Sequence, residues 1–313
     1  MKFLLLFVII MLNIPYISLN DENAAHYIYY QDDEHINYWF EWWYVNFKGE
    51  KNFMVMFYTL GDLKNPFASI VGCAVFLFNE NNSLEAITSY PFIDYSLDYE
   101  KCNVEIAGNR FYEKNGNIFI EYKKDDFELF LKIKPMGRKF KEISTINRWQ
   151  WMAWYVAIPY GEGEAIIKYE GKKYEFKGKA YHDHNWGMAK KKDFKWDWGE
   201  FNFNNEFAVI YGIVNGEGKI HFVNESIHIS IPCKKIEYLE WKKINGIKKP
   251  TKLHVYGYEY GKEAELFIET EKAYIIGIKR IGIPYLFGKC YGFVKIHGKT
   301  YSFNCEGFYE HRA

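Results

Sequence analysis

Short apolar runs separated by turn residues dominate the chain after its first twenty residues. Residues 53–60 and 70–78 are apolar runs of strand length, and residues 127–134 alternate between apolar and polar side chains. Asn115-Gly116 separates two further runs and is a strong signal for a two-residue hairpin turn. The pattern therefore predicts an all-β protein of antiparallel strands joined by hairpins.

Two segments interrupt this pattern. Residues 136–147 are rich in charge and lack a strand period, which predicts a loop. Lys234–Lys243 has a helical pattern, because Ile236 and Leu239 fall on one side at a spacing of three. We therefore expect a short helix within a second half that is otherwise made of strands.

The first twenty residues have the features of an export signal. Lys2 supplies a positive start, and Phe3–Leu12 is an uninterrupted apolar run. This length is short for a membrane span, which needs about 20 residues, and suits the core of a signal peptide. Ser18-Leu19-Asn20 fits the cleavage rule only loosely, so a cleaved signal peptide and an uncleaved anchor both stay open. Either form of residues 1–20 predicts an exported or membrane-associated protein, with this segment as the membrane contact.

Composition narrows the choice of ligand. The chain has 313 residues, and its 40 basic and 40 acidic side chains cancel, so no overall field attracts nucleic acid. Aromatic residues make up 20% of the chain, and they favour strands and line apolar ligand cavities. The sequence contains no dinucleotide, phosphate-loop, serine-elbow or HExxH motif. We therefore predict a hydrophobic small-molecule ligand, no cofactor and no nucleic-acid partner.

The five cysteines include no CxxC pair, which disfavours a structural zinc site. Buried free thiols are the expected state. A bridge between Cys290 and Cys305 stays open, because both residues lie on strands that flank one predicted turn.

Histidine spacing does not define a metal site. His182 and His184 would share one face of a strand, but no third ligand is evident near them, so no metal is predicted. A metal-dependent hydrolase would need another His, Asp or Glu close to both. Glu41 is expected to be a buried partner of an arginine, either Arg148 or Arg312.

The densest chemical motif is Tyr181-His182-Asp183-His184-Asn185-Trp186-Gly187. It resembles the motif of the carotenoid 1,2-hydratases (hydroxyneurosporene synthases), in which an aromatic residue, an aspartate and Trp-Gly keep this spacing. AttH-like lipocalin-fold proteins, tocopherol cyclases and fungal Diels–Alderases are related to that family. Further segments resemble it in the same order: Glu41-Trp42-Trp43-Tyr44, Trp154–Pro159 and Gly307-Phe308-Tyr309-Glu310.

This resemblance spans residues 39–310 and implies two lipocalin-like antiparallel β-barrel or sandwich modules in tandem. We expect them at 35–188 and 189–313, because the chain is long for one small barrel. The resemblance implies acid-initiated hydration, or the related cyclisation, of an isoprenoid-type C=C bond in a hydrophobic substrate. Relatives hydrate, cyclise or only bind, so a non-catalytic exported carrier of a hydrophobic ligand is the alternative.

Asp183 is the predicted proton donor. Protonating an isolated alkene requires a carboxyl group that is still protonated near neutral pH, and burial among rings raises the pKa of such a group. Tyr181 or His184 would hold the water that captures the cation. The resemblance implies that Tyr181 and Asp183 matter in the same way, with Trp151 or Trp154 near another important position. A structural aspartate that bonds backbone N–H groups at a turn is the alternative.

Six tryptophans are predicted to contact the substrate, because the faces of aromatic rings stabilise a cation without reacting with it. They are Trp43, Trp151, Trp154, Trp186, Trp196 and Trp198. Alternatively most of them are barrel core, since rings at strand spacing usually pack.

Strict alternation places Tyr181 and Asp183 on the face of their strand that also presents Lys177 and Lys179, where a buried acid is not expected. A β-bulge at Gly178 would remove this conflict, and so would the passage of the strand from one module into the other. We therefore expect irregular geometry between Lys177 and Tyr181.

Overall fold

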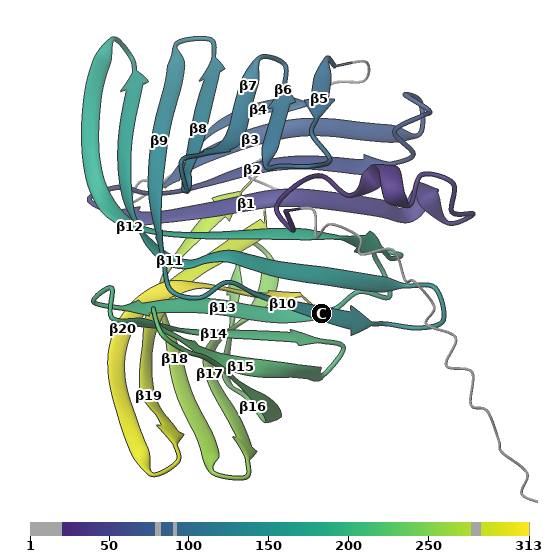
Figure 1. Ribbon diagram of the computed structural model, residues 1–313. Coiled ribbons are helices and arrows are strands. Elements are labelled where there is room, and N and C mark those ends of the chain that lie inside the picture. The colour runs from purple at the N-terminus through teal and green to yellow at the C-terminus, as the bar shows by residue number, and fades with distance from the viewer. Residues whose placement is uncertain (1–20, 79–82, 90–92, 277–282, 313) are drawn as a thin grey trace, which may run out of the picture.

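The computed structural model describes residues 21–78, 83–89, 93–276 and 283–312, and the predicted all-β class is confirmed (Figure 1). Two 3₁₀ turns, η1 (Tyr27–Tyr29) and η2 (Ile36–Tyr38), precede the strands. Within the described ranges, no helix is long and apolar enough to cross a membrane. The leader predicted at residues 1–20 lies outside them.

The first sheet has twelve antiparallel strands and curls into an open half-barrel (Figure 1). The strand order is β4-β3-β2-β1-β12-β11-β9-β8-β7-β6-β5, and β10 pairs with β11. Side chains also connect strands that are not paired in the sheet. The hydroxyl groups of Thr88 on β4 and Tyr122 on β8 hydrogen-bond over 3.1 Å. The strands are β1 (Trp39–Gly49), β2 (Asn52–Gly61), β3 (Ser69–Phe78), β4 (Ser83–Ser89), β5 (Tyr95–Leu97), β6 (Asn103–Ile106), β7 (Asn109–Lys114), β8 (Asn117–Lys124), β9 (Phe127–Met136), β10 (Phe140–Thr145), β11 (Trp151–Tyr169) and β12 (Lys172–Met188).

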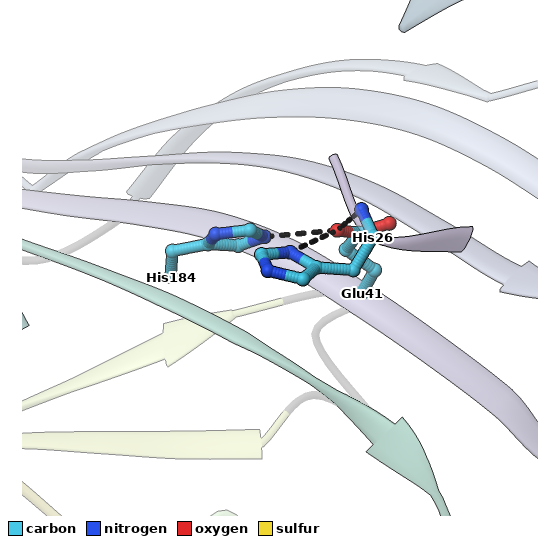
Figure 2. A group of neighbouring side chains, drawn as sticks. All are labelled: His26, Glu41 and His184. Carbon is cyan, nitrogen blue, oxygen red and sulfur yellow. Dashed lines mark hydrogen bonds and ion pairs between the residues drawn. The ribbon is translucent and has the colours of Figure 1, made fainter. Parts of the chain in front are cut away.

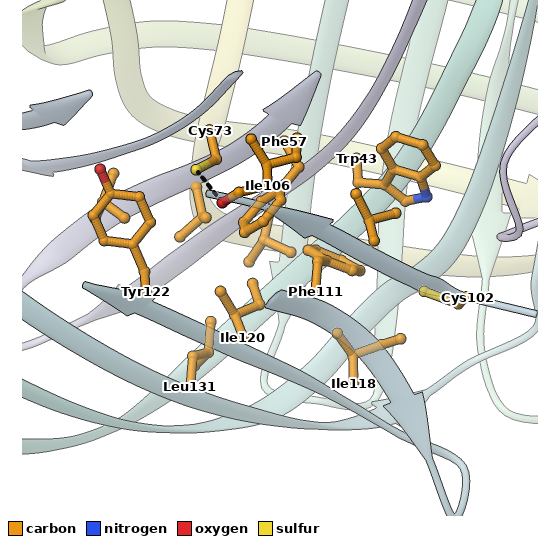
Figure 3. Packing of buried hydrophobic residues seen from close by; sticks show 14 of the residues in the cluster. Trp43, Phe57, Cys73, Cys102, Ile106, Phe111, Ile118, Ile120, Tyr122 and Leu131 are labelled. Carbon is orange, nitrogen blue, oxygen red and sulfur yellow. Dashed lines mark hydrogen bonds between the residues drawn. The ribbon is translucent and has the colours of Figure 1, made fainter. Parts of the chain in front are cut away.

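Alternate residues of these strands fill the half-barrel with an apolar core (Figure 3). Trp43, Phe57, Phe111, Ile120 and Leu131 are fully buried there. Burial of each such side chain stabilises the fold by about 1.5–3 kcal/mol, which explains why the period-2 pattern of the sequence determines the sheet.

The second sheet is a closed antiparallel barrel of eight strands, β13 to β20, with its own apolar core. Cys290 and Cys305 lie opposite each other on the last two strands, and all five cysteines are free thiols. The strands are β13 (Trp196–Phe203), β14 (Phe207–Val214), β15 (Glu217–Val223), β16 (His228–Ile244), β17 (Ile247–Glu259), β18 (Lys262–Ile276), β19 (Ile283–Ile296) and β20 (Lys299–Arg312).

A third apolar core joins the two sheets. Tyr44, Phe76 and Trp154 from the half-barrel pack with Ile210 and Phe308 from the closed barrel. In Figure 1 the strands β1, β12 and β11 lie on the side of the half-barrel that faces the closed barrel. From Tyr181 to Asn185, the face of β12 that points away from the half-barrel core is therefore not exposed to solvent.

The predicted hairpin turns are present. Asn115 and Gly116 have φ of 52° and 72° and join β7 to β8. Asn204 and Asn205 also have positive φ, at 47° and 57°, between β13 and β14. Asparagine and glycine tolerate this left-handed conformation, which a two-residue hairpin turn requires.

The predictions of a loop at residues 136–147 and of a helix at Lys234–Lys243 are wrong. Residues 136–147 include the strand β10 (Phe140–Thr145), which pairs with β11. A strand at the edge of an antiparallel sheet can expose one face to solvent, so its many charged side chains do not prevent it from forming. Lys234–Lys243 lies within β16 and is not helical. Register shifts near Lys235 and Glu240 interrupt the alternation of β16. The apolar residues of this strand therefore do not follow a period of two, and the spacing of Ile236 and Leu239 resembles that of a helix.

Candidate functional site

The predicted acid lies where β12 passes between the two sheets. Tyr181, Asp183 and Asn185 alternate with His182 and His184, so the two sets point to opposite faces of the half-barrel. The Tyr181 ring belongs to the core between the sheets. Asp183 shares this covered face and is only 4% exposed.

Three donors surround the Asp183 carboxyl group. Oδ2 accepts the hydroxyl hydrogen of Tyr181 over 2.8 Å and the indole N–H of Trp154 over 3.0 Å. Oδ1 accepts a hydrogen bond from the Asn185 side-chain amide over 2.8 Å. Burial raises the pKa of the carboxyl group to about 7, because the loss of solvent outweighs the effect of the three donors. The group is therefore suited to exchange a proton near neutral pH.

The strand that presents Asp183 is regular, and the expected irregularity between Lys177 and Tyr181 is wrong. From Gly178 to Met188, β12 pairs with β1 without a register shift. The register shifts lie on the other side, in β11 near Ile158. Asp183 is buried without any bulge in β12, because the closed barrel covers the outer face of the half-barrel at this point.

Aromatic rings and two unpartnered polar atoms lie beside Tyr181 and Tyr44, on the same face as the carboxyl group. The Trp198 ring centroid is 5.5 Å from that of Tyr181 and 5.8 Å from that of Tyr44. Trp198 Nε1 and Asn46 Oδ1 are buried and have no hydrogen-bond partner among the described residues. A buried donor and a buried acceptor without partners are the groups that an ordered water or a polar ligand atom would satisfy.

A buried ion pair completes this layer. The Lys48 ammonium group of β1 donates to both carboxylate oxygens of Glu200 on β13. Burial lowers the pKa of Lys48 and raises that of Glu200, and each shift is opposed by the charge of the partner. Sequence analysis missed this row, although Tyr44, Asn46 and Lys48 alternate with apolar residues along β1 and so mark its second face.

A second polar cluster lies on the opposite face of β12 (Figure 2). Glu41 of β1 is fully buried and faces His184 and His26, not the predicted Arg148 or Arg312. Ligand atoms of the three side chains all lie within 4.8 Å of one another. His182 is not part of the cluster, because its ring nitrogens bond the Tyr44 carbonyl and the Asn23 side chain.

Comparison with solved structures identifies the architecture. No protein-family profile and no curated protein matches the chain. An AttH-like protein of Nitrosomonas europaea superimposes with a TM-score of 0.68 and 16% identity, covering 89% of this chain and 93% of that one. Kievitone hydratase of Nectria haematococca superimposes with a TM-score of 0.57 and 10% identity, covering 87% of this chain and 88% of that one. CghA superimposes with a TM-score of 0.55 and 9% identity, covering 88% of this chain and 89% of that one. The chain has their fold.

On this fold, only some of the predicted site residues come together. Asp183, Tyr181, Trp154 and Trp198 form one cluster between the sheets. His184 points to the other face of β12, where its ring stacks on Trp43 at 4.5 Å between centroids.

The remaining predicted tryptophans lie away from Asp183. Trp186 belongs to the half-barrel core and stacks on His26 at 3.7 Å, and Trp151 packs at the edge of the same core. Trp196 donates its indole N–H to Glu310 over 3.0 Å and lies under the Arg312 guanidinium. Sequence position alone did not separate these roles, because all of these rings alternate along strands.

The surface of the described residues includes two hollows that are not lined by Asp183. One of about 530 Å³ lies beside Trp149 and Trp151. The other, about 660 Å³, lies at an end of the closed barrel beside Trp196 and Tyr238. Because Asp183 is 4% exposed, a ligand can reach its carboxyl group only if side chains between the sheets rearrange.

Proposed function

We propose that this protein is an enzyme of the hydratase or cyclase type that acts on an isoprenoid-type C=C bond in a hydrophobic substrate, with Asp183 as the acid. The observation that carries the proposal is the enclosed Asp183 carboxyl group, held by Tyr181 and Trp154 on a single oxygen. Two donors on Oδ2, against the single Asn185 amide on Oδ1, favour negative charge on Oδ2, so Oδ1 is the oxygen that carries the transferable proton.

The reaction would begin when Asp183 transfers that proton to one alkene carbon, leaving a tertiary cation at the other. The faces of Trp154, Tyr181 and Trp198 would stabilise the cation through their quadrupoles. A water placed by Trp198 Nε1 and Asn46 Oδ1 would add to the cation and return a proton to Asp183. The sum is addition of one water. If a second double bond adds in place of water, it forms a ring and a new cation, which loses a proton to the Asp183 carboxylate to give an isomer of the substrate.

The test is mass spectrometry of isoprenoid alkenes incubated with the protein in ¹⁸O-labelled water. Wild type should give a product heavier by one labelled water, or an isomer of unchanged mass and altered retention for cyclisation. Asp183→Asn should give neither while still binding the alkene. Asp62→Asn is the matched control, because Asp62 also accepts a tyrosine hydroxyl hydrogen, from Tyr27 over 2.6 Å, but lies just after β2. Equal product from wild type and Asp183→Asn would refute the assignment.

A carrier is the second candidate, favoured by the hollow of about 660 Å³ that opens near Trp196 and Tyr238 and not at Asp183. Charged side chains such as Lys195 and Arg312 also line this hollow, so its ligand would have a polar end beside its apolar part. A carrier would bind the alkenes unchanged, and Trp196→Ala would weaken binding while Asp183→Asn would not. The apolar run Phe3–Leu12 makes export, or attachment to a membrane, part of either proposal.

A further inference from the structure

His26, Glu41 and His184 meet on the face of β12 opposite to Asp183 (Figure 2). They come from the segment before η1, from β1 and from β12, so three parts of the chain converge. His184 Nε2 lies 3.1 Å from Glu41 Oε1, and His26 Nδ1 lies 3.4 Å from the same oxygen. Glu41 and His184 are fully buried, and the His26 side chain is 14% exposed, which leaves one side of the cluster near solvent.

The hydrogen-bond pattern of His184 determines which of its nitrogens has a proton. Nδ1 lies 2.9 Å from the Glu22 carbonyl oxygen, which can only accept, so Nδ1 must donate. In the neutral ring Nε2 then carries a lone pair and can only accept, and it faces a carboxylate oxygen that is also an acceptor. Two acceptors at hydrogen-bond distance repel unless a cation lies between them. That cation is either a proton or a metal ion.

The atoms around this contact favour a metal ion. Glu41 Oε2 and His26 Nδ1 are buried and have no hydrogen-bond partner among the described residues. A proton between Glu41 and His184 would satisfy neither of them. A metal ion would engage both imidazoles and the carboxylate at once, and a tetrahedral site with ligand bonds near 2.0–2.1 Å separates its donor atoms by about 3.3 Å. The separations of 3.1 and 3.4 Å at Glu41 Oε1 match this spacing, and the three ligand atoms all lie within 4.8 Å of one another, so a small movement of the His26 ring would complete the site.

We propose that His26, Glu41 and His184 bind a divalent transition-metal ion, with Zn²⁺ the ion that this donor set suits best. Two imidazole nitrogens and one carboxylate oxygen are borderline ligands, whereas Ca²⁺ and Mg²⁺ prefer oxygen alone. Three protein ligands leave at least one coordination position for water or another small ligand.

The surroundings hold the ligands in place before any ion binds. The His26 ring stacks on Trp186 at 3.7 Å and the His184 ring on Trp43 at 4.5 Å. The Glu22 carbonyl orients His184 in the way that outer partners orient metal-binding histidines. The His26 backbone N–H donates to Glu41 Oε1 over 2.7 Å, which fixes the carboxylate as well.

The ion would fasten the segment before β1 to the sheet, because His26 belongs to that segment and the other two ligands to paired strands. This assignment is independent of the proposed reaction. The side chains of residues 183 and 184 leave β12 on opposite faces, so the two sites are separated by the sheet.

The experiment titrates the purified, chelator-treated full chain with ZnCl₂ by calorimetry, and with Co²⁺ by visible absorption. The variants are His26→Ala and Glu41→Gln. His254→Ala is the matched control, because His254 also contacts two carboxylates, Glu237 and Glu265, but on the surface of the closed barrel. We expect one Zn²⁺ per wild-type chain, unchanged binding in the control, tetrahedral Co²⁺ bands, and affinity lower by about tenfold or more in both variants.

Absence of Zn²⁺ binding by wild type, or equal binding by His26→Ala, would overturn the proposal. Glu41→Gln also tests the proton alternative, because its amide can donate to His184 Nε2 as a protonated Glu41 would. If the proton alternative is right, Glu41→Gln unfolds like wild type and neither protein responds to Zn²⁺. His26→Ala decides the matter if the buried Glu41 variant does not fold, since His26 lies nearest the surface.

Discussion

Tyr181 donates its hydroxyl hydrogen to Oδ2 of Asp183 over 2.8 Å, although the two residues lie two positions apart on one strand. Side chains at this spacing stand side by side on the same face, so a regular strand brings the phenol to the carboxyl group. Trp154, on the neighbouring strand β11, reaches the same oxygen over 3.0 Å. The pairing of β11 with β12 therefore assembles the site.

Tyr181→Phe removes one of these donors and little else. We expect product formation to fall by about tenfold or more, because the acid loses the group that orients it. The unfolding free energy should fall by about 0.5–1.5 kcal/mol below pH 7, where Asp183 is protonated, and by more above it, where the bond is to a charged group. Urea unfolding and the labelled-water assay measure the two effects. Tyr174→Phe, at an exposed tyrosine of the same strand, should change neither. Similar losses in both variants would contradict a specific role.

The ion pair between Lys48 and Glu200 should couple the two sheets. Removing one member leaves the other charge buried and unpaired, so Lys48→Met should lower the unfolding free energy by about 3–5 kcal/mol. The double variant Lys48→Met, Glu200→Met should recover most of this loss, since no charge is then buried. Urea unfolding gives both values.

Lys168→Met is the control for this prediction. Lys168 pairs with Glu128 at 2.7 Å on the surface, and such exposed pairs contribute about 0–1 kcal/mol. A loss in Lys48→Met no larger than in Lys168→Met would contradict the coupling.

Local features of the fold were predictable from the sequence, because they depend on neighbours in the chain. Asn115-Gly116 and Asn204-Asn205 adopt the positive φ that hairpin turns need, and strict alternation produced β9 as expected. The bulged strand β16 was not predicted, since register shifts near Lys235 and Glu240 break its period.

The candidate site was predictable only in part. The motif around Asp183 indicated the acid and Tyr181, but the burial of both depends on a barrel that begins after them in the chain. His26 could not be found as a partner of Glu41 and His184, because η1 and β12 are far apart in sequence. Contacts of this kind depend on how distant segments pack, which periodicity does not encode.

Acid should destabilise the protein through His228. This ring stacks on Phe140 at 4.4 Å and on His221 at 5.3 Å, and burial, helped by the charges of Lys219 and Arg138, lowers its pKa from 6.5 to about 4. The unfolded chain therefore binds a proton first as the pH falls. Stability conferred by the neutral ring is full above pH 6.5 and is lost between about pH 6.5 and 4.

His228→Asn should flatten this dependence, because the variant has no ring to protonate. The slope of unfolding free energy against pH between 6.5 and 4 should fall by up to about 1.4 kcal/mol per pH unit, the value for one proton. Urea unfolding at several pH values measures it. Unfolding at pH 8 serves as the reference for effects unrelated to protonation. Parallel curves for the two proteins would show that His228 does not titrate in this way.

Gly212 of β14 gives Trp154 the room to reach Asp183. A Cβ at position 212 would lie 2.4 Å from a carbon at the far edge of the Trp154 ring, so Gly212→Ala must displace that ring. We expect a loss of about 1–3 kcal/mol from overpacking, together with weaker product formation as the indole N–H leaves Oδ2. Trp154→Phe lacks the far edge of the ring. In the Trp154→Phe background, Gly212→Ala should lower the unfolding free energy by less than it does in wild type. The difference, measured by urea unfolding, is the coupling energy of the two positions and should be about 0.5–3 kcal/mol. Additive losses would mean that Gly212 does not position Trp154, and the closed barrel would then have no direct part in holding the acid.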